Sequence, residues 1–229
     1  MKTNGNTILI TGGSAGIGFE LAKQFAQLGN KVLITGRNAD RLKEAANKLE
    51  NVVPIAGDVT DPESADRLLT QIQQEYPELN IVINNAGYAD VYELNAHAGA
   101  FSKANREIQT NYLSIVDLTE KLLPTLLKNE QPAVVNITSI VVYYPQKMLP
   151  TYTASKAALK SYTDVLRNTF ENQLRVFELI PPLVNTDFSK EIGGENGIPP
   201  QEVAVELIRA MENDQWLVPV GMSKEFVHA

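Results

Sequence analysis

The chain has 229 residues, of which 44% are hydrophobic and 21% charged, and its formal net charge at pH 7 is −7. These values fit a folded globular protein with a substantial core, and the acidic balance argues against a nucleic-acid partner. The chain has no cysteine, which excludes disulfides and thiolate chemistry. No apolar run is long enough for a membrane span or a signal peptide, so we expect a cytoplasmic protein without a membrane partner.

Short β-branched segments alternate along the chain with longer segments of helical periodicity. This alternation predicts an α/β fold of the Rossmann type, a doubly wound parallel sheet of about seven strands with helices on both faces. We find no repeat or linker and expect one domain over residues 1–229. The expected strands are residues 7–11, 31–35, 52–56, 81–84, 133–138, 175–180 and 216–220, and the expected helices are residues 16–28, 39–49, 62–76, 101–128 with a break near Asn111, 151–170 and 199–212.

A glycine-rich turn over residues 12–18 joins the first expected strand directly to a helix. Glycines permit a tight turn and let a pyrophosphate approach the backbone at the helix N-terminus. Such a turn alone can equally be an ordinary connection, but its place after the first strand predicts a dinucleotide site. We assign Gly12, Ser14, Gly16, Ile17 and Gly18 to cofactor binding.

Candidate site residues also follow the later strands. In a parallel sheet the carboxyl ends of the strands lie at one edge, and ligands bind outside that edge. We therefore expect these segments to form one cleft with the glycine turn. They begin at Arg37 after the second strand, Asp58 after the third, Asn84 at the end of the fourth, Ser139 after the fifth and Pro181 after the sixth.

Two tyrosines are each followed by a lysine four residues later. Tyr143 precedes Lys147, with Pro145 between them, whereas Tyr152 precedes Lys156 in a segment of helical character. Because proline disfavours a helix at this point, the first pair has no assured common face. Residues four apart on a helix share a face, so the second pair is the better candidate for tyrosine chemistry tuned by a lysine. Tyr143 and its neighbour Tyr144 are then candidates for the wall of a substrate pocket.

These motifs together resemble those of the short-chain dehydrogenase/reductase family, in its compact single-domain branch. The resemblance covers nearly the whole chain and is carried by the spacing TGxxxGxG over residues 11–18, NNAG over residues 84–87 and YTASK over residues 152–156. The late segments at residues 198–211 and 218–221 also resemble a bacterial branch associated with teichoic-acid D-alanylation clusters.

The resemblance implies an oxidoreductase that transfers a hydride between a nicotinamide cofactor and a small carbonyl or alcohol substrate. It implies that Tyr152 is the general acid and base, that Ser139 polarises the substrate oxygen, and that Asn111 supports a proton relay. Lys156 would lower the pKa of the tyrosine, since a nearby cation favours phenolate, and would hold the ribose. Two alternatives stay open: a non-catalytic NADP(H)-binding sensor or scaffold, and an epimerase or dehydratase on the same fold.

The resemblance also assigns the other cofactor contacts. Residues 35–38 contain no acid, and Arg37 there suits a 2′-phosphate, which favours NADP(H) over the alternative NAD(H). The remaining contacts are Asp58 and Val59 at the adenine, Asn84, Ala86 and Gly87 along the cleft, and Tyr152, Lys156, Pro181 and Thr186 near the ribose and nicotinamide.

The chain departs from the family pattern after the sixth strand. Pro182 stands where the family usually has a glycine, which removes an N–H donor. The following segment, residues 187–198, is a short lid whose glycines predict mobility. His97 and His228 lie far apart, so we expect no metal site. By analogy with the family we expect a homodimer, or a tetramer, formed through the helices around residues 101–128 and Tyr152.

Overall fold

The computed structural model describes residues 1–227, and within them seven parallel strands form one sheet. The strand order is β3-β2-β1-β4-β5-β6-β7, so the order reverses between β1 and β4. This arrangement confirms the predicted doubly wound sheet. The strands are β1 (Thr7–Thr11), β2 (Lys31–Gly36), β3 (Val52–Ala56), β4 (Ile81–Asn84), β5 (Ala133–Ile137), β6 (Arg175–Ile180) and β7 (Leu217–Pro219).

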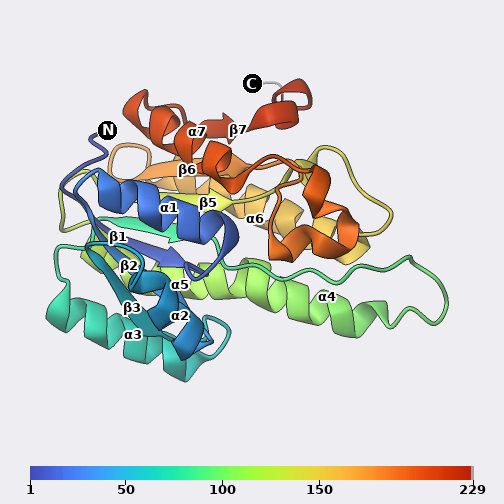
Figure 1. Ribbon diagram of the computed structural model, residues 1–229, viewed down its shortest axis with the longest axis horizontal. Helices are drawn as coiled ribbons and strands as arrows, with labels where there is room; N and C mark the ends of the chain where they lie inside the picture. Colours follow the sequence, from blue (N-terminus) through green and yellow to red (C-terminus); the bar gives the residue numbers. More distant parts are fainter. Residues whose placement is uncertain (228–229) are drawn as a thin grey trace.

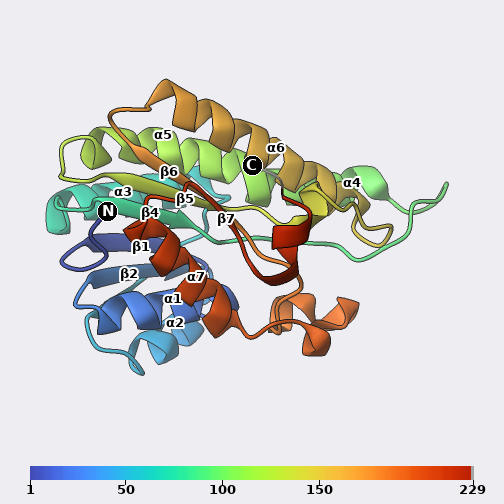
Figure 2. The same ribbon diagram turned by 90° about the horizontal axis from the view of Figure 1, so that it is seen from above.

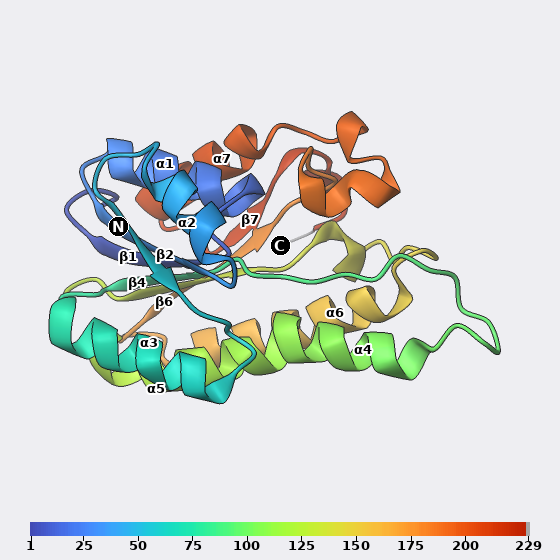
Figure 3. The same ribbon diagram turned by 60° about the horizontal axis from the view of Figure 1, so that its bottom comes forward.

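Helices cover both faces of the sheet (Figure 3). One face carries α1 (Gly16–Gln27), α2 (Ala39–Ala46) and α7 (Pro200–Glu212), and the other carries α3 (Pro62–Glu75), α5 (Ser114–Leu126) and α6 (Pro150–Thr169). Beyond α5, helix α4 (Ala100–Ile108) extends past the edge of the sheet, and the segment between β4 and α4 projects furthest (Figure 1).

The core consists of two apolar layers, because successive strand side chains point to opposite faces. Ile8 and Ile10 pack under α1 and α7, whereas Leu9 between them packs under α3 and α5. An apolar stripe on α5 is buried, with Leu122 and Leu126 both 0% exposed. Burying a side chain of this size contributes about 1.5–3 kcal/mol, so a polar residue in the stripe would weaken the packing of α5 against the sheet.

Local sequence explains where the helices begin. Asp61 accepts a hydrogen bond from the N–H of Glu63, and Pro62 occupies the first helical position of α3, both of which favour a helix start. The Asn38 side chain accepts one from the N–H of Arg41 at 2.9 Å and caps α2 in the same way. Helix α2 ends at Ala46, three residues earlier than the sequence indicates, because residues 47–49 form turns instead.

A single π-helical turn, Gln109–Leu113, joins α4 to α5 and contains Asn111. This turn confirms the predicted break in the long helix. Such turns interrupt the regular α-helical hydrogen bonds and are frequent at functional sites. Here the turn directs the Asn111 side chain into the interior, where it is 0% exposed.

The segment between β6 and α7 forms two short 3₁₀ helices, η3 (Asp187–Ile192) and η4 (Gly194–Asn196) (Figure 2). Its ends are joined by two main-chain hydrogen bonds, from Asn185 N to Ile198 O at 2.8 Å and from Ile198 N to Leu183 O at 3.0 Å. A Cβ at Gly197 would lie 2.7 Å from Leu183 O. This glycine therefore permits close backbone packing, a different role from the mobility that the sequence predicted.

Within residues 1–227, no helix combines the length and the apolar character that crossing a lipid bilayer requires. Phe101 on α4 and Val165 on α6 are 87% and 60% exposed. The homodimer expected through these helices stays a prediction.

Candidate active site

A cleft of about 750 Å³ lies at the carboxyl ends of the strands. Residues that follow β1 to β6 line it, as the parallel sheet predicts. Of the predicted site residues, Gly12, Ser14, Gly16, Ile17, Arg37, Asp58, Val59, Ala86, Gly87, Ser139, Tyr152, Lys156, Pro181 and Thr186 line the cleft. Gly18, Asn84 and Asn111 do not line it, and each supports a lining segment from behind.

The glycine turn joins β1 to α1 and bends tightly against β2. Gly12 adopts a φ of +67° and donates its N–H to Thr35 O at 2.8 Å. A Cβ at Gly18 would lie 2.4 Å from Gly12 O, so only glycine lets α1 approach the turn this closely. No side chain caps the first turn of α1, which leaves its leading N–H groups available to an anion.

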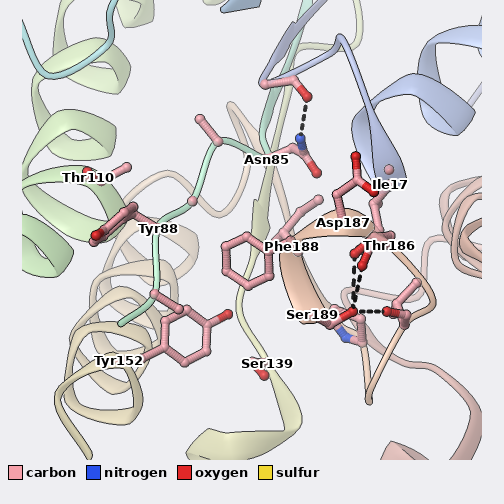
Figure 4. Close-up of a pocket in the computed structure, with 18 of the residues that line it drawn as sticks. Ile17, Asn85, Tyr88, Thr110, Ser139, Tyr152, Thr186, Asp187, Phe188 and Ser189 are labelled. Carbon is pink, nitrogen blue, oxygen red and sulfur yellow. Dashed lines mark hydrogen bonds between the residues drawn. The ribbon is translucent and has the colours of Figure 1, made fainter. Parts of the chain in front are cut away.

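Asn85 ties the end of β4 to the glycine turn and lines the cleft, although the sequence pointed to its neighbour Asn84 instead. The Asn85 amide donates to Thr11 O at 2.8 Å and to Gly12 O at 3.1 Å. The Thr11 hydroxyl in turn accepts hydrogen bonds from the N–H groups of Asn85 and Ala86. These bonds hold both walls of the cleft together at the point where the strand order reverses (Figure 4).

Asn84 lies in the interior of the sheet, 1% exposed. Its amide donates to Asn136 Oδ1 on β5 at 2.8 Å, and the Asn136 amide donates to the Thr163 hydroxyl on α6 at 2.9 Å. These hydrogen bonds form a buried polar link from β4 to α6, and the cofactor contact of Asn84 stays a prediction. Because buried amides are costly unless hydrogen-bonded, this link fixes the position of α6 against the sheet.

Asn111 connects the π-helical turn to two segments at the cleft. Its Oδ1 accepts from the N–H of Tyr88 at 2.8 Å, and its Nδ2 donates to Tyr88 O at 2.8 Å and to the Ser155 hydroxyl at 2.9 Å. The Ser155 hydroxyl itself donates to Tyr152 O at 2.7 Å. Asn111 therefore positions both the Gly87–Tyr88 wall and the first turns of α6.

Tyr152 and Lys156 lie on the first turns of α6, where the i, i+4 spacing places them on one face. Both are buried, at 8% and 4% exposed, and Lys156 Nζ lies 5.8 Å from the centroid of the tyrosine ring. Ser139 follows β5 and lines the same cleft. Tyr143, by contrast, lies outside the cleft lining and shares no helix with Lys147, so the structure brings the second tyrosine–lysine pair into the cleft and not the first.

Burial governs the ionisation of this group in the ligand-free protein. It raises the pKa of the Tyr152 phenol above its ordinary value of 10.0, and the Ser139 hydroxyl acts in the opposite direction. The lowering expected from Lys156 does not prevail, because burial of the phenol is the largest influence on its pKa. Burial also lowers the pKa of the Lys156 amine, to about 8. Lys156 Nζ donates to Ile137 O at 2.7 Å. At neutral pH the phenol is therefore protonated.

We expect Lys156 to make the stability of the ligand-free protein rise with pH between about 8 and 10. The amine has a pKa of about 8 when folded and 10.5 as its ordinary value, so the unfolded state binds more protons in this window. The free energy of unfolding should rise by about 2 kcal/mol across it. Urea unfolding of the wild type and of Lys156→Met at several pH values measures this rise, because the variant lacks the amine. If the free energy of unfolding changed equally with pH in both proteins, the prediction would be contradicted.

Two arginines line the end of the cleft at β2, away from Tyr152. Arg37 follows β2, and Arg41 on the first turn of α2 lines the cleft beside it, with its guanidinium 3.9 Å from Asp187. Sequence reasoning missed Arg41, although its spacing of four from Arg37 at a predicted helix start could have indicated it. Asp58 holds the next turn, because its Oδ1 accepts from the Thr60 N–H at 2.9 Å and hydroxyl at 2.7 Å.

An aromatic side chain that the sequence did not single out projects into the middle of the cleft (Figure 4). Phe188 of η3 lies 6.0 Å from Tyr152 between ring centroids and is 51% exposed. Tyr144 lines the cleft, as expected of a pocket wall, whereas Tyr143, which was expected there too, does not. Pro182 also lines the cleft. No group of His, Asp or Glu suited to a metal ion occurs among residues 1–227, and His228 lies outside them.

Known proteins share this arrangement. The chain matches the short chain dehydrogenase family over residues 6–197. It is 37% identical over 199 residues to the uncharacterized oxidoreductase DltE of Bacillus subtilis, covering 86% of this chain and 79% of that protein. It is 31% identical over 199 residues to the NADP-dependent 3-hydroxy acid dehydrogenase of Schizosaccharomyces pombe, covering 82% and 75%. A solved short chain dehydrogenase from Burkholderia cenocepacia in complex with NADP has the same fold, with a TM-score of 0.88 at 24% identity over 98% and 92% of the two chains.

A doubly wound sheet with a glycine turn at its switch point is a dinucleotide-binding fold of the Rossmann type, and here a Ser-Tyr-Lys group lies at the same edge. The chain belongs to the short-chain dehydrogenase/reductase family. The predicted family is thereby confirmed, and the match to DltE supports the predicted bacterial branch.

Proposed function

We propose that the protein is an NADP(H)-dependent carbonyl reductase or alcohol dehydrogenase. The observation that carries the proposal is the position of Tyr152, with Ser139 and Lys156, in the same cleft as the glycine turn. The proposal also accords with the relative that is named as NADP-dependent.

The residues present fit a dinucleotide. Gly16 adopts a φ of +55°, and a Cβ there would lie 3.1 Å from Thr186 Cγ2, so glycine keeps open the space between α1 and the segment after β6. The uncapped start of α1 offers N–H donors for a pyrophosphate, and Asp58 and Val59 line the cleft after β3. Pro182 contributes no N–H, and the hydroxyl of Thr186, which lines the cleft, is a donor in this segment for a carboxamide.

When bound, the nicotinamide cofactor supplies the hydride that reduces the carbonyl carbon. The Ser139 hydroxyl donates a hydrogen bond to the carbonyl oxygen and polarises the C=O bond. As the π electrons pass to that oxygen, the protonated Tyr152 gives it the proton, and the alcohol is released. The buried amine of Lys156 holds the ribose beside the phenol. Asn111 keeps the start of α6 in place through Ser155.

A screen that follows NADPH absorbance with aldehydes, ketones, diketones and sugars tests the proposal. Oxidation of NADPH in proportion to the alcohol formed supports it. Cofactor binding without turnover of any carbonyl would favour the sensor or scaffold, and conversion of substrate without net NADPH oxidation would favour an epimerase or dehydratase.

We expect kcat/KM to be higher with NADPH than with NADH, because Arg37 and Arg41 line the end of the cleft that follows β2. In Arg37→Leu, kcat/KM for NADPH should fall about 10- to 100-fold, and that for NADH should change less than about threefold. Steady-state kinetics with both cofactors measure this.

Arg67→Leu is the matched control, since Arg67 is an exposed arginine of α3 outside the cleft. It should leave the cofactor preference unchanged. Comparable kcat/KM for NADH and NADPH in the wild type would refute the preference.

A further inference from the structure

Charged residues are unevenly distributed along the cleft. Six of the described lining residues carry charge: Arg37, Arg41, Asp58, Lys156, Asp187 and Glu191. Arg37 and Arg41 belong to the β2 end, and β2 is three strand positions from β5 in the sheet, or about 14 Å. Ser139 follows β5, so these arginines lie well away from the hydroxyl that would hold a substrate oxygen.

The other cation that lines the cleft is Lys156, which is buried and donates one hydrogen bond to Ile137 O. In the proposed reaction its remaining donors would hold the ribose, so it is not free to pair with a substrate carboxylate. Lys190 belongs to η3 but does not line the cleft, whereas Asp187 and Glu191 of the same helix do. Asp187 lies 3.9 Å from the Arg41 guanidinium, so the charge that η3 adds to the cleft away from the β2 end is the carboxylate of Glu191.

Apolar side chains surround Tyr152. It forms a buried cluster with Ile140, Val141 and Leu149, and Val91 and Ile192 pack against that cluster. Met148, 40% exposed, completes this wall of the cleft. The half-exposed ring of Phe188 faces the same space (Figure 4). An apolar substituent placed here would remove these side chains from water, which is favourable in proportion to the area covered.

From these observations we infer that the substrate is a neutral aldehyde or ketone with an apolar substituent, and not a carbonyl compound that carries a carboxylate near the reacting carbon. This inference rests on the proposed carbonyl reduction and adds the substrate class. A carboxylate beside Tyr152 would be desolvated among apolar side chains in a cleft that Glu191 also lines, and the arginines that line the cleft lie at its β2 end. An unpaired ion is costly in such surroundings.

Matched esters and acids provide the test, because each pair has the same ketone and differs in charge. We would measure kcat/KM with saturating NADPH at pH 7 and low ionic strength for ethyl acetoacetate against acetoacetate, and for methyl benzoylformate against benzoylformate. We expect each ester to exceed its acid at least about 100-fold. An acid that equals or exceeds its ester in both pairs would overturn the inference.

Adding a positive charge to this wall of the cleft should shift the preference from the esters toward the acids. In Met148→Arg we expect kcat/KM for the acids to rise about tenfold or more relative to the esters, since a guanidinium pairs well with a carboxylate. Met148→Gln, of similar size without charge, should leave the ester-to-acid ratio within about threefold of the wild type. An unchanged ratio in a folded Met148→Arg protein would count against the inference, and circular dichroism checks that it is folded.

The failures of the two proposals can be told apart. Turnover of the acids with NADPH oxidation, at rates above those of the esters, leaves carbonyl reduction intact and overturns the substrate class alone. No turnover of either member of any pair, nor of any carbonyl in the broader screen, overturns the proposed function and the substrate class with it.

Discussion

Tyr152→Phe is expected to lower kcat/KM for carbonyl reduction by at least about 10³-fold while NADPH affinity changes by less than about threefold. The phenol of Tyr152 lies in the cleft with both Ser139 and Lys156, and burial keeps it protonated at neutral pH by raising its pKa. Phenylalanine keeps the ring that packs in the apolar cluster with Val141 and Leu149, so the fold and the cofactor site remain. Steady-state kinetics and a fluorescence titration with NADPH separate the two effects.

Tyr143→Phe is the matched control, because Tyr143 begins the other tyrosine–lysine pair and lies outside the cleft lining. Its kcat/KM should stay within about twofold of the wild type. Retention of most activity in Tyr152→Phe, or an equal loss in Tyr143→Phe, would exclude Tyr152 as the proton donor.

Asn111→Ala should lower the free energy of unfolding by about 3 kcal/mol and reduce turnover as well. The substitution removes three hydrogen bonds, to Tyr88 N, Tyr88 O and the Ser155 hydroxyl. Each buried group left without a partner costs about 1–3 kcal/mol. Because Ser155 is linked to Tyr152, we expect kcat to fall more than NADPH affinity does. Urea unfolding and steady-state kinetics measure the two consequences.

Asn105→Ala provides the comparison, since Asn105 is an exposed asparagine on α4, close to Asn111 in the chain. Its free energy of unfolding should change by less than about 0.5 kcal/mol. If Asn111→Ala were as stable as Asn105→Ala, the three hydrogen bonds would not support the site in the way that the geometry indicates.

Most of the sheet and much of the cleft could be predicted, because short sequence patterns determine the strands and the order of strands and helices determines where the strands end. Strand residues such as Ile8 and Leu9 form continuous apolar runs that are buried on both faces. In a parallel sheet the strand ends must lie at one edge, so the amino-acid sequence alone was enough to place Ser14, Arg37 and Ser139 together.

The remaining features of the site depend on packing between residues far apart in the chain, which no local sequence pattern indicates. The sequence could not show which of two adjacent asparagines would face the cleft. Asn84 turns to Asn136 across the sheet, and Asn85 turns to the glycine turn. Burial of Tyr152 and Lys156 depends on every element packed around them, so the directions of their pKa shifts emerged only with the fold. Phe188 sits in an irregular segment that has no periodicity to read.

The segment between β6 and α7, whose two ends are joined by hydrogen bonds, is a part of the chain where sequence can change without disturbing the sheet. Asn185 and Ile198 close the segment onto itself, so the residues between them form a module whose contents can change while the strands stay in register. Asp187, Phe188 and Glu191 all belong to this module and all reach the cleft. Mutation there can retune which molecules are accepted, while the proton donor on α6 and the glycine turn at β1 keep the same chemistry.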